Sequence, residues 1–359
     1  MADQLALLVD QVRQAHDRRK PLAIVGNGSK SFMGRAQEGE PLSVAGHTGI
    51  VDYQPVELVL TARAGTRIAE LNAALDEQGQ RLSFEPPLFG GEATIGGTLA
   101  TNQSGPGRPW LGSVRDMVLG VRLINGEAEV LRFGGQVMKN VAGYDLSRFQ
   151  AGAMGTLGVM TDISLKVLPK PACTRTLRLP CTAHEAITLM NRLAATPKPL
   201  TAACWVGGML YLRLEGAESA VDGTLTQWMQ QWSVKLWQES ESFWQELREQ
   251  QHTFFAGDKP LWRFSINSAA PLLDKDSQLI DWGGAQRWLR TDQASGVDVS
   301  ELQHWAETQG GSVSLYRGGD RQGEVNPVLA EPVRRLHRRI KNAVDPQGLF
   351  NPGRLYSWL

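Results

Sequence analysis

Three glycine-rich clusters contain most of the residues whose types and spacing suit a phosphorylated ligand. They cover residues 25–31, 93–107 and 152–158 of a 359-residue chain. Because glycine has no Cβ atom, such stretches can aim successive backbone N–H groups into one concavity, where they bind a phosphate or pyrophosphate. Three clusters within one domain are hard to explain as turns alone. Side chains that can add hydrogen bonds are those of Asn27, Ser29, Ser31, Thr98, Thr101, Asn102 and Ser104.

The first cluster, Val25-Gly26-Asn27-Gly28-Ser29-Lys30-Ser31, does not match the two common phosphate-binding loops. A P-loop needs Gly-Lys-Ser/Thr after four variable residues, whereas this chain reads Gly28-Ser29-Lys30. A Rossmann loop needs a third glycine where Ser31 stands. The glycine- and proline-containing stretch 32–48 cannot readily supply the crossover helix of a βαβ unit. Taken alone, the cluster is equally compatible with an ordinary tight turn.

Residues that could bind a metal ion or an iron–sulfur cluster are scarce. Cys173, Cys181 and Cys204 lack Cys-x-x-Cys spacing and are too few for four cysteine ligands. We therefore expect no metal site, and electrons handled by this chain must leave through another group. Lysine and arginine number 37, as do aspartate and glutamate, so no overall field attracts nucleic acid.

The apolar periodicity predicts the elements that position the clusters. A helix is expected over residues 5–15, followed by a strand at 21–25 that ends at the first cluster. A second helix is expected from Arg67 to Gln78, with Thr66 as its N-cap and Gly79 just past its end.

An Asn125-Gly126 pair between two apolar runs predicts a β-hairpin, so the sheet must be partly antiparallel. Alternating residues from Val159 to Val167 predict another strand, which ends at Pro169-Lys170-Pro171. We place a domain boundary there. The expected domains are residues 1–171, 172–320 and 321–359.

Residues 172–320 are expected to form a smaller α+β domain, because short strands alternate with helical stretches such as 185–193 and 218–231. Ten of the 11 tryptophans lie beyond residue 200. They suit either the core of this domain, which is the default interpretation, or a tryptophan-rich subunit interface.

The clusters, taken in order with three further segments, resemble the vanillyl-alcohol-oxidase (PCMH) type of FAD-binding family. This resemblance implies an α+β fold in which two subdomains bind an extended FAD. It also implies a smaller α+β cap domain and a C-terminal segment that returns to the flavin. The further segments are residues 112–116, 139–146 and 345–353.

The resemblance assigns residues to FAD one by one. The first loop would bind the pyrophosphate, the second cluster would lie along the cofactor, and the third would approach the adenine half. Many relatives tether the flavin through a histidine or a cysteine, but this chain has neither in these clusters, so FAD should be bound noncovalently. The residues implied are Gly26, Asn27, Gly28, Ser29, Lys30, Gly96, Gly97, Thr98, Thr101, Asn102, Ser104, Gly152, Gly155, Gly158 and Val159.

Within this fold family the chain is similar to FAD-binding subunits of bacterial glycolate oxidase, through residues 139–146, the tryptophan-rich middle and the segment 325–356. That likeness implies oxidation of glycolate to glyoxylate in a complex with a related flavoprotein and an iron–sulfur subunit. The chain itself is expected in the cytoplasm, and the complex would place it peripherally on the inner membrane. The N-terminal sequence Met1-Ala2-Asp3-Gln4 lacks the basic region of a signal peptide, which agrees with that location.

Catalytic groups are harder to find. Related 2-hydroxy-acid enzymes contain a His-x-Gly-Asp-Gly-Asn-x-His type of segment, and the nearest analogue here, residues 317–321, has no histidine. Arg317 and Arg321 are weak candidates for binding a carboxylate, with pairing to acids such as Asp320 as the default interpretation, and Asn351 is a third candidate near the flavin. Three hypotheses stay open: a redox-active subunit, a flavin-stabilised assembly subunit, and a stand-alone enzyme of the D-lactate dehydrogenase kind.

The predicted helix 328–344 has Val333, Leu336, Ile340 and Ala343 on one stripe and several arginines elsewhere. The default interpretation is a solvated face. Docking onto a partner or onto an anionic membrane surface is the alternative.

Overall fold

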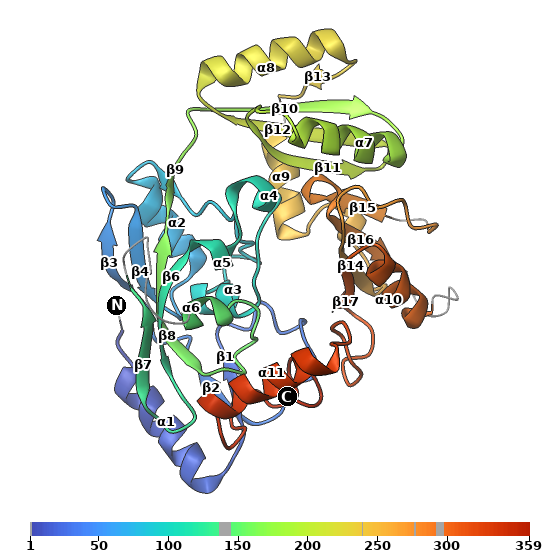
Figure 1. Ribbon diagram of the computed structural model, residues 1–359. Coiled ribbons are helices and arrows are strands. Elements are labelled where there is room, and N and C mark those ends of the chain that lie inside the picture. The colour runs from blue at the N-terminus through green and yellow to red at the C-terminus, as the bar shows by residue number, and fades with distance from the viewer. Residues whose placement is uncertain (1, 136–144, 239, 276–277, 292–297) are drawn as a thin grey trace. The chain divides into compact units, whose positions relative to one another are not determined.

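The computed structural model (Figure 1) describes residues 2–135, 145–238, 240–275, 278–291 and 298–359. The chain divides into two compact units. The first unit comprises Met1–Gln103, Ser113–Pro169 and Asp320–Leu359, and the second comprises Ser104–Gly112 and Lys170–Gly319. Of the expected segment 139–146, residues 139–144 lie outside the described residues.

A five-stranded antiparallel sheet with the order β3-β4-β8-β6-β7 forms the centre of the first unit. Its inner face packs on helices α2 and α3, which contribute the fully buried residues Leu71, Leu75 and Leu99. The core therefore lies between the sheet and the two helices. The elements are β3 (Ile50–Gln54), β4 (Val59–Arg63), β6 (Val118–Ile124), β7 (Val130–Gly134), β8 (Val159–Lys166), α2 (Ile68–Asp76), α3 (Ile95–Ala100) and α5 (Val114–Met117).

The predicted hairpin joins β6 to β7, but its loop is longer than two residues. The side chain of Asn125 accepts hydrogen bonds from the backbone N–H groups of Glu127 and Glu129, at 3.0 and 2.8 Å. These bonds add to the backbone hydrogen bonds of the turn, in which Ala128 N–H donates to Asn125 O at 3.1 Å.

The N-cap predicted for the second helix is wrong. Helix α2 begins one residue later, with Arg67 in extended conformation as its N-cap. The Thr66 hydroxyl instead accepts the N–H of Gly49, at 2.9 Å. The Thr66 side chain, which the local sequence predicts as the N-cap, is therefore hydrogen-bonded to the neighbouring loop instead of to the helix.

A smaller layer of the first unit contains the N-terminal helix and a two-stranded parallel sheet. Strand β1 pairs with β2 without a helix between them, because the glycine-rich stretch 26–39 makes the connection. Leu349 and Phe350 from the C-terminal segment pack into the same apolar cluster. The remaining elements of this unit are α1 (Leu5–Arg18), β1 (Leu22–Val25), β2 (Glu40–Ser43), β5 (Gln80–Arg81), α6 (Leu146–Phe149), β9 (Leu168–Pro169) and α11 (Glu331–Val344).

The second unit is built on an eight-stranded antiparallel sheet with the order β13-β10-β12-β11-β15-β16-β14-β17. Helices α7 and α8 pack on it, and α7 begins with a capping box formed by Thr182 and Glu185. The strands are β10 (Cys173–Pro180), β11 (Leu200–Val206), β12 (Met209–Gly216), β13 (Lys235–Leu236), β14 (Leu261–Ser265), β15 (Gln278–Asp281), β16 (Gln286–Arg290) and β17 (Ser312–Arg317). The helices are α4 (Arg108–Leu111), α7 (Ala183–Ala194), α8 (Glu218–Gln231), α9 (Ser240–Glu249), η1 (Thr253–Phe255), η2 (Trp282–Gly284) and α10 (Val299–Thr308).

Tryptophans fill the interior of this second unit. Trp228, Trp244, Trp262 and Trp288 are all buried. Trp244 also donates to the Thr176 hydroxyl at 2.9 Å, so its polar atom is satisfied. The default interpretation of the tryptophan-rich region as core is thus confirmed for these four residues.

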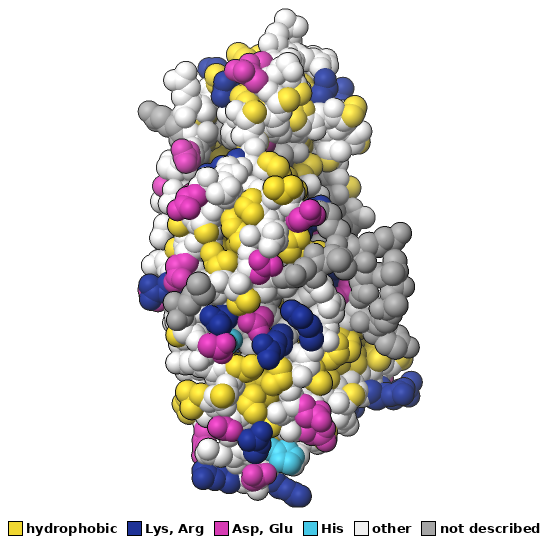
Figure 2. Space-filling model, turned by 90° about the vertical axis from the view of Figure 1, so that its left-hand side faces the viewer, with side chains coloured by type: hydrophobic (Ala, Val, Ile, Leu, Met, Phe, Trp, Pro, Cys, Tyr) yellow, Lys and Arg dark blue, Asp and Glu magenta, His cyan; other side chains and the backbone are white. Residues whose placement is uncertain are grey.

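The surface agrees with the balanced charge of the chain. On the face in Figure 2, lysine and arginine side chains are interspersed with aspartate and glutamate. Among the helices within the described ranges, none has the length and apolar composition needed to cross a bilayer.

Candidate cofactor site

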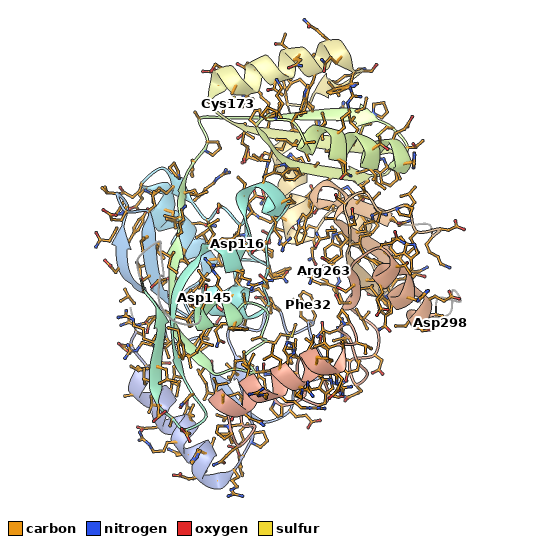
Figure 3. The ribbon with its side chains drawn as sticks, in the orientation of Figure 1. Phe32, Asp116, Asp145, Cys173, Arg263 and Asp298 are labelled. Atoms are coloured by element: carbon orange, nitrogen blue, oxygen red, sulfur yellow. The ribbon has the colours of Figure 1, made fainter. Side chains whose placement is uncertain are left out.

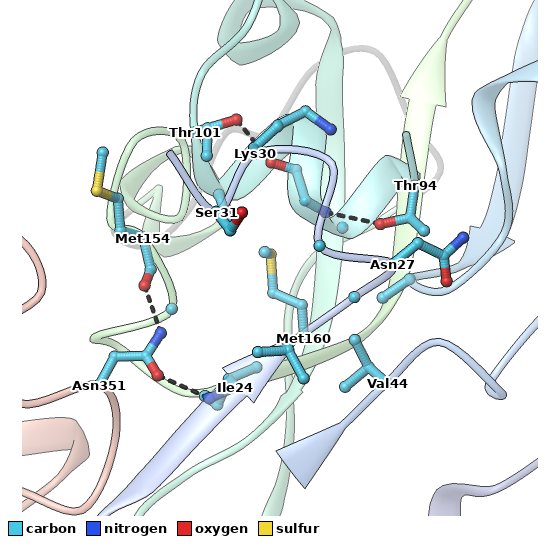
Figure 4. Close-up of a pocket in the computed structure, with 18 of the residues that line it drawn as sticks. Ile24, Asn27, Lys30, Ser31, Val44, Thr94, Thr101, Met154, Met160 and Asn351 are labelled. Carbon is cyan, nitrogen blue, oxygen red and sulfur yellow. Dashed lines mark hydrogen bonds between the residues drawn. The ribbon is translucent and has the colours of Figure 1, made fainter. Parts of the chain in front are cut away.

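A pocket in the first unit lies between the first glycine cluster and helix α3 (Figure 4). It contains about 840 Å³ of empty space, counting its open mouth. Its walls come from the end of β1, the first loop, α3, the loop after residue 153, strand β8 and the C-terminal segment. Chain segments far apart in sequence therefore meet at one place.

The first loop turns sharply at Gly28, whose φ of 75° is accessible to glycine at little energetic cost. The loop continues as a tight turn, with Ser31 N–H donating to Gly28 O at 3.0 Å. Lys30 is buried, and its ammonium donates to the Ser29 hydroxyl at 3.2 Å. A loop that begins after a strand and ends on a buried cation is well suited to an anionic group.

The second cluster forms α3, which begins beside this loop. The Thr94 hydroxyl accepts the Gly97 N–H at 3.1 Å, and the Thr101 hydroxyl donates to Gly97 O at 2.7 Å (Figure 4). A Cβ atom on Gly26 would lie 2.9 Å from the Thr94 hydroxyl oxygen, and one on Gly96 would lie 2.8 Å from Ala64 O. Glycine is therefore favoured at both positions, because the loop lies close to the start of α3 at Gly26 and α3 lies close to the backbone after β4 at Gly96.

The C-terminal segment is joined to the pocket by Asn351. Its carboxamide oxygen accepts the Ile24 N–H at 2.7 Å (Figure 4) and the Gln37 side-chain amide at 2.9 Å. Its amide nitrogen donates to Met154 O at 2.6 Å (Figure 4). The side chain thus connects β1 to the third cluster at the edge of the pocket.

The charges that line the pocket are all positive. Lys30 and Arg354 line it, and no aspartate or glutamate does among the described residues. Arg354 donates to Ser31 O at 3.0 Å and to Arg35 O, and burial lowers its pKa. Val44, Met160 and neighbouring aliphatic side chains form an apolar wall. A pocket with cations at the loop and an apolar wall suits a molecule that has both phosphates and an aromatic ring system.

Most of the cofactor residues expected from sequence lie at this pocket, and a minority do not. Thr98 and Val159 are fully buried in the core, Gly152 and Asn102 lie behind the lining, and Ser104 belongs to the second unit. Those that line the pocket are Gly26, Asn27, Gly28, Ser29, Lys30, Gly96, Gly97, Thr101, Gly155 and Gly158.

Sequence reasoning missed several lining residues. Gln37 and Val44 lie in the irregular connection after the first cluster, where no periodicity marks them. Met160 belongs to β8, whose alternation indicated a strand but not which face borders a pocket. Arg354 was detectable in principle, since it follows Asn351-Pro352-Gly353 directly.

The two candidate arginines for a carboxylate are both bonded to backbone carbonyls. Arg317 donates to Phe255 O at 2.6 Å in the second unit, and Arg321 donates to Gly34 O at 3.4 Å in the first. Asp320 accepts the Gln322 N–H at 2.8 Å. Through these contacts, both arginines support loops.

A third arginine, Arg263 on β14, was not singled out from the sequence (Figure 3). Its guanidinium carbon lies 5.3 Å from the centroid of the Tyr316 ring. Burial lowers its pKa and the nearby Arg108 lowers it further, while Tyr316 raises it. A half-buried guanidinium whose charged neighbour is another arginine is chemically suited to a small anion. No sequence pattern marks this residue, because the partial burial of a single arginine depends on strands distant in sequence.

No grouping of histidine, cysteine and acidic side chains suitable for a metal ion occurs among the described residues. Burial raises the pKa of the Cys181 thiol to about 11, and it also raises that of Cys204. Both thiols are therefore protonated at neutral pH and are poor nucleophiles.

Comparison with known proteins agrees with the geometry of the pocket. Residues 2–134 match a family model described as an FAD binding domain. Over its full length the fold is similar to that of alkyldihydroxyacetonephosphate synthase, with a TM-score of 0.66, 16% identity, and coverage of 96% of this chain and 75% of that chain. The likeness shows the fold alone, an α+β FAD-binding architecture of the vanillyl-alcohol-oxidase type.

Curated relatives identify the family. The chain is 31% identical to the glycolate oxidase subunit GlcD of Bacillus subtilis over 45% of this chain and 34% of that protein. It is 31% identical to a D-lactate dehydrogenase of Anaerostipes hadrus over 44% of this chain and 34% of that protein. It is 45% identical to the glycolate oxidase subunit GlcE of Escherichia coli over 99% of both chains. The chain therefore belongs to the family of FAD-binding oxidoreductase subunits that includes GlcE.

Proposed function

We propose that the pocket of the first unit binds the pyrophosphate and adenine portions of one FAD. The pyrophosphate would lie on the loop Gly26–Ser31, with Lys30 balancing part of its charge, and the third cluster would face the adenine half. The close approach at Gly26 supports this assignment, since an added Cβ atom would fill the space between the loop and Thr94 at the start of α3. FAD bound here would supply the acceptor for hydride or electrons.

The FAD is bound noncovalently in this proposal. Neither a histidine nor a cysteine lines the pocket among the described residues. Precipitation of the purified protein with acid should leave yellow supernatant and a colourless pellet, with one FAD per chain in the supernatant. Flavin that stays with the denatured pellet after washing would contradict noncovalent binding.

The chain is the FAD-binding subunit of a multisubunit 2-hydroxy-acid dehydrogenase that oxidises glycolate to glyoxylate. The observation that supports this function best is the 45% identity to a glycolate oxidase subunit across 99% of both chains. The partners we propose are a related flavoprotein subunit and an iron–sulfur subunit. The location we propose is cytoplasmic, on the inner membrane through the complex, and the second unit is proposed as the cap or interface domain.

A native purification tests this function. The tagged chain, expressed in its own host, should bring down a second flavoprotein and an iron–sulfur protein, and the eluate should oxidise glycolate with an artificial acceptor. A matched preparation from a strain that lacks the partner flavoprotein gene should contain FAD but show no activity. Recovery of the chain alone, fully active toward glycolate, would replace this proposal by a stand-alone dehydrogenase.

A second candidate function is an assembly subunit whose FAD stabilises the fold without turning over. The absence of a histidine-rich catalytic segment from the sequence favours it. Potentiometric titration of the complex separates the two candidates, because a flavin that transfers electrons must have a potential between those of the glycolate couple and the acceptor, whereas a flavin that only stabilises the fold need not.

A further inference from the structure

One face of helix α11 contacts the rest of the first unit through basic side chains. Lys341 is buried, and the guanidinium carbons of Arg334 and Arg338 lie 4.9 and 5.0 Å from the centroid of the Trp358 ring. His337 stacks on the same ring, with centroids 6.3 Å apart. These residues recur at intervals of three and four, so they form one face of the helix.

The opposite face is apolar and exposed. Val333 and Leu336 are 42% and 52% exposed, and Val328, just before the helix, is 67% exposed. Ile340 and Ala343 continue the stripe at helical spacing and are not buried. Amphipathic helices of globular proteins usually bury this side. A stripe that remains uncovered indicates a surface that another molecule covers.

Two arginines lie along one edge of the stripe. Arg335 and Arg339 are exposed, and neither forms an ion pair within the described ranges, whereas Arg334 and Arg338 both pair with Glu331. The outer face of α11 is therefore half aliphatic and half cationic.

We propose that this outer face, made of Val333, Leu336, Ile340 and Ala343 with Arg335 and Arg339 at its edge, binds an apolar groove of the partner flavoprotein subunit that has carboxylates on its rim. The inference rests on the proposed function, because it assumes that partner. Laying an apolar helix face in a groove is a common recognition mode. The flanking cations are arginines, which are enriched in protein interfaces, whereas lysines are depleted there.

Two other occupants fit the surface less well. A symmetric antiparallel pairing with a second copy would place each arginine row against its like, which is repulsive. A lipid surface is bound by helices that present tryptophan, phenylalanine or several leucines. The exposed stripe of α11 has a single leucine and no aromatic residue.

The test measures the affinity of the purified, FAD-loaded chain for its purified partner flavoprotein subunit by biolayer interferometry. Leu336→Glu should weaken binding by about tenfold or more. Leu7→Glu is the matched control, because Leu7 lies on α1 of the same unit and is 53% exposed, close to the 52% of Leu336. The control should bind within about twofold of wild type. FAD content and thermal melting should be unchanged in both variants, and Leu336→Ala provides a milder replacement should Leu336→Glu fold poorly.

The charge of the partner is tested by Arg335→Glu/Arg339→Glu. This variant should bind about tenfold or more weakly and should lose most of the salt dependence of association. If wild type binds the partner and both sets of variants bind equally well, the inference is wrong and the proposed function stands. If wild type does not bind the partner at all, both fail. A wild-type dimer in light scattering that Leu336→Glu dissolves, or sedimentation with phosphatidylethanolamine–phosphatidylglycerol vesicles that it abolishes, would also overturn the inference.

Discussion

At the scale of single residues, Gly28 offers the sharpest test of the pocket. Its φ is 75°, and an added Cβ atom would meet no protein atom within 4 Å. Gly28→Val should therefore strain the backbone by about 1–3 kcal/mol without a steric clash, while placing a side chain beside the loop amides. FAD affinity should fall by about tenfold or more, as measured by fluorescence titration of the flavin-depleted protein.

Gly79→Val is the matched control for this prediction. Gly79 lies in the turn after α2, outside the pocket, has a φ of 63°, and likewise has no atom within 4 Å of an added Cβ. The same backbone strain should leave FAD affinity unchanged there. Equal loss of FAD in both variants would mean that Gly28 acts through stability, and no loss in either would place the pyrophosphate elsewhere.

Residue types were predictable where small size itself is the signal. Gly26, Gly28, Gly96 and Gly97 were found from sequence because they stand in glycine-rich clusters, where close packing at Gly26 and Gly96 and a positive φ at Gly28 favour glycine. Gln37 and Arg354 were not found, because they reach the pocket from irregular segments whose path depends on tertiary contacts. Arg263 was not found because its environment is built from strands distant in sequence.

At the scale of elements, a buried ion pair joins α11 to the C-terminal segment. Lys341 donates to Asp345 at 2.7 Å and to the carbonyls of Thr156 and Phe350 at 2.8 Å each. Lys341→Met would leave the carboxylate of Asp345 buried and unpaired, so the free energy of unfolding should fall by about 3–5 kcal/mol. Urea denaturation measures this change, and Lys341→Met/Asp345→Asn should recover part of it.

A surface pair of similar geometry supplies the control. Lys20 lies 2.8 Å from Glu40, but both side chains are more than half exposed. Lys20→Met should leave stability nearly unchanged, because solvent screens such pairs. If Lys20→Met and Lys341→Met lowered the free energy of unfolding by similar amounts, burial would not be the reason for the effect of Lys341→Met.

Elements were predictable where periodicity was long and uninterrupted. Helices α1, α7 and α8, and strand β8, lie where the apolar pattern predicted them. The cap of α2 was not predictable, because Thr66 bonds to Gly49 in a neighbouring loop. The pairing of β1 with β2 was also hidden, because parallel strands joined by a glycine-rich loop leave no pattern between them.

At the scale of the whole molecule, the chain has a cofactor pocket but, in its described part, few side chains suited to act as a base or a nucleophile. The pocket, the buried Lys341–Asp345 pair and α11 all belong to the first unit. Burial lowers the pKa of His252 in the second unit, and its Nδ1 accepts the Phe254 N–H at 3.2 Å, so this histidine serves as a cap. Arg263 has the positive charge needed to bind a carboxylate, but an arginine does not supply the base that removes the hydroxyl proton.

The division of labour between subunits gives the last prediction. Oxidation of a 2-hydroxy acid needs a base for the hydroxyl proton and a cation for the carboxylate, and each typically contributes about 10²-fold or more to the rate. The isolated chain should therefore contain FAD whose absorbance stays unchanged for minutes under anaerobic glycolate or D-lactate, whereas the complex should lose that absorbance rapidly. Reconstituting the complex with Gly28→Val, prepared free of FAD and verified to remain so, distinguishes two roles for this subunit. Loss of glycolate oxidation in an intact complex would assign electron transfer to the FAD of this chain. Undiminished oxidation would instead assign this subunit a role in assembly. Rapid bleaching of the isolated wild-type chain would contradict the prediction, because it would require a base within this chain itself.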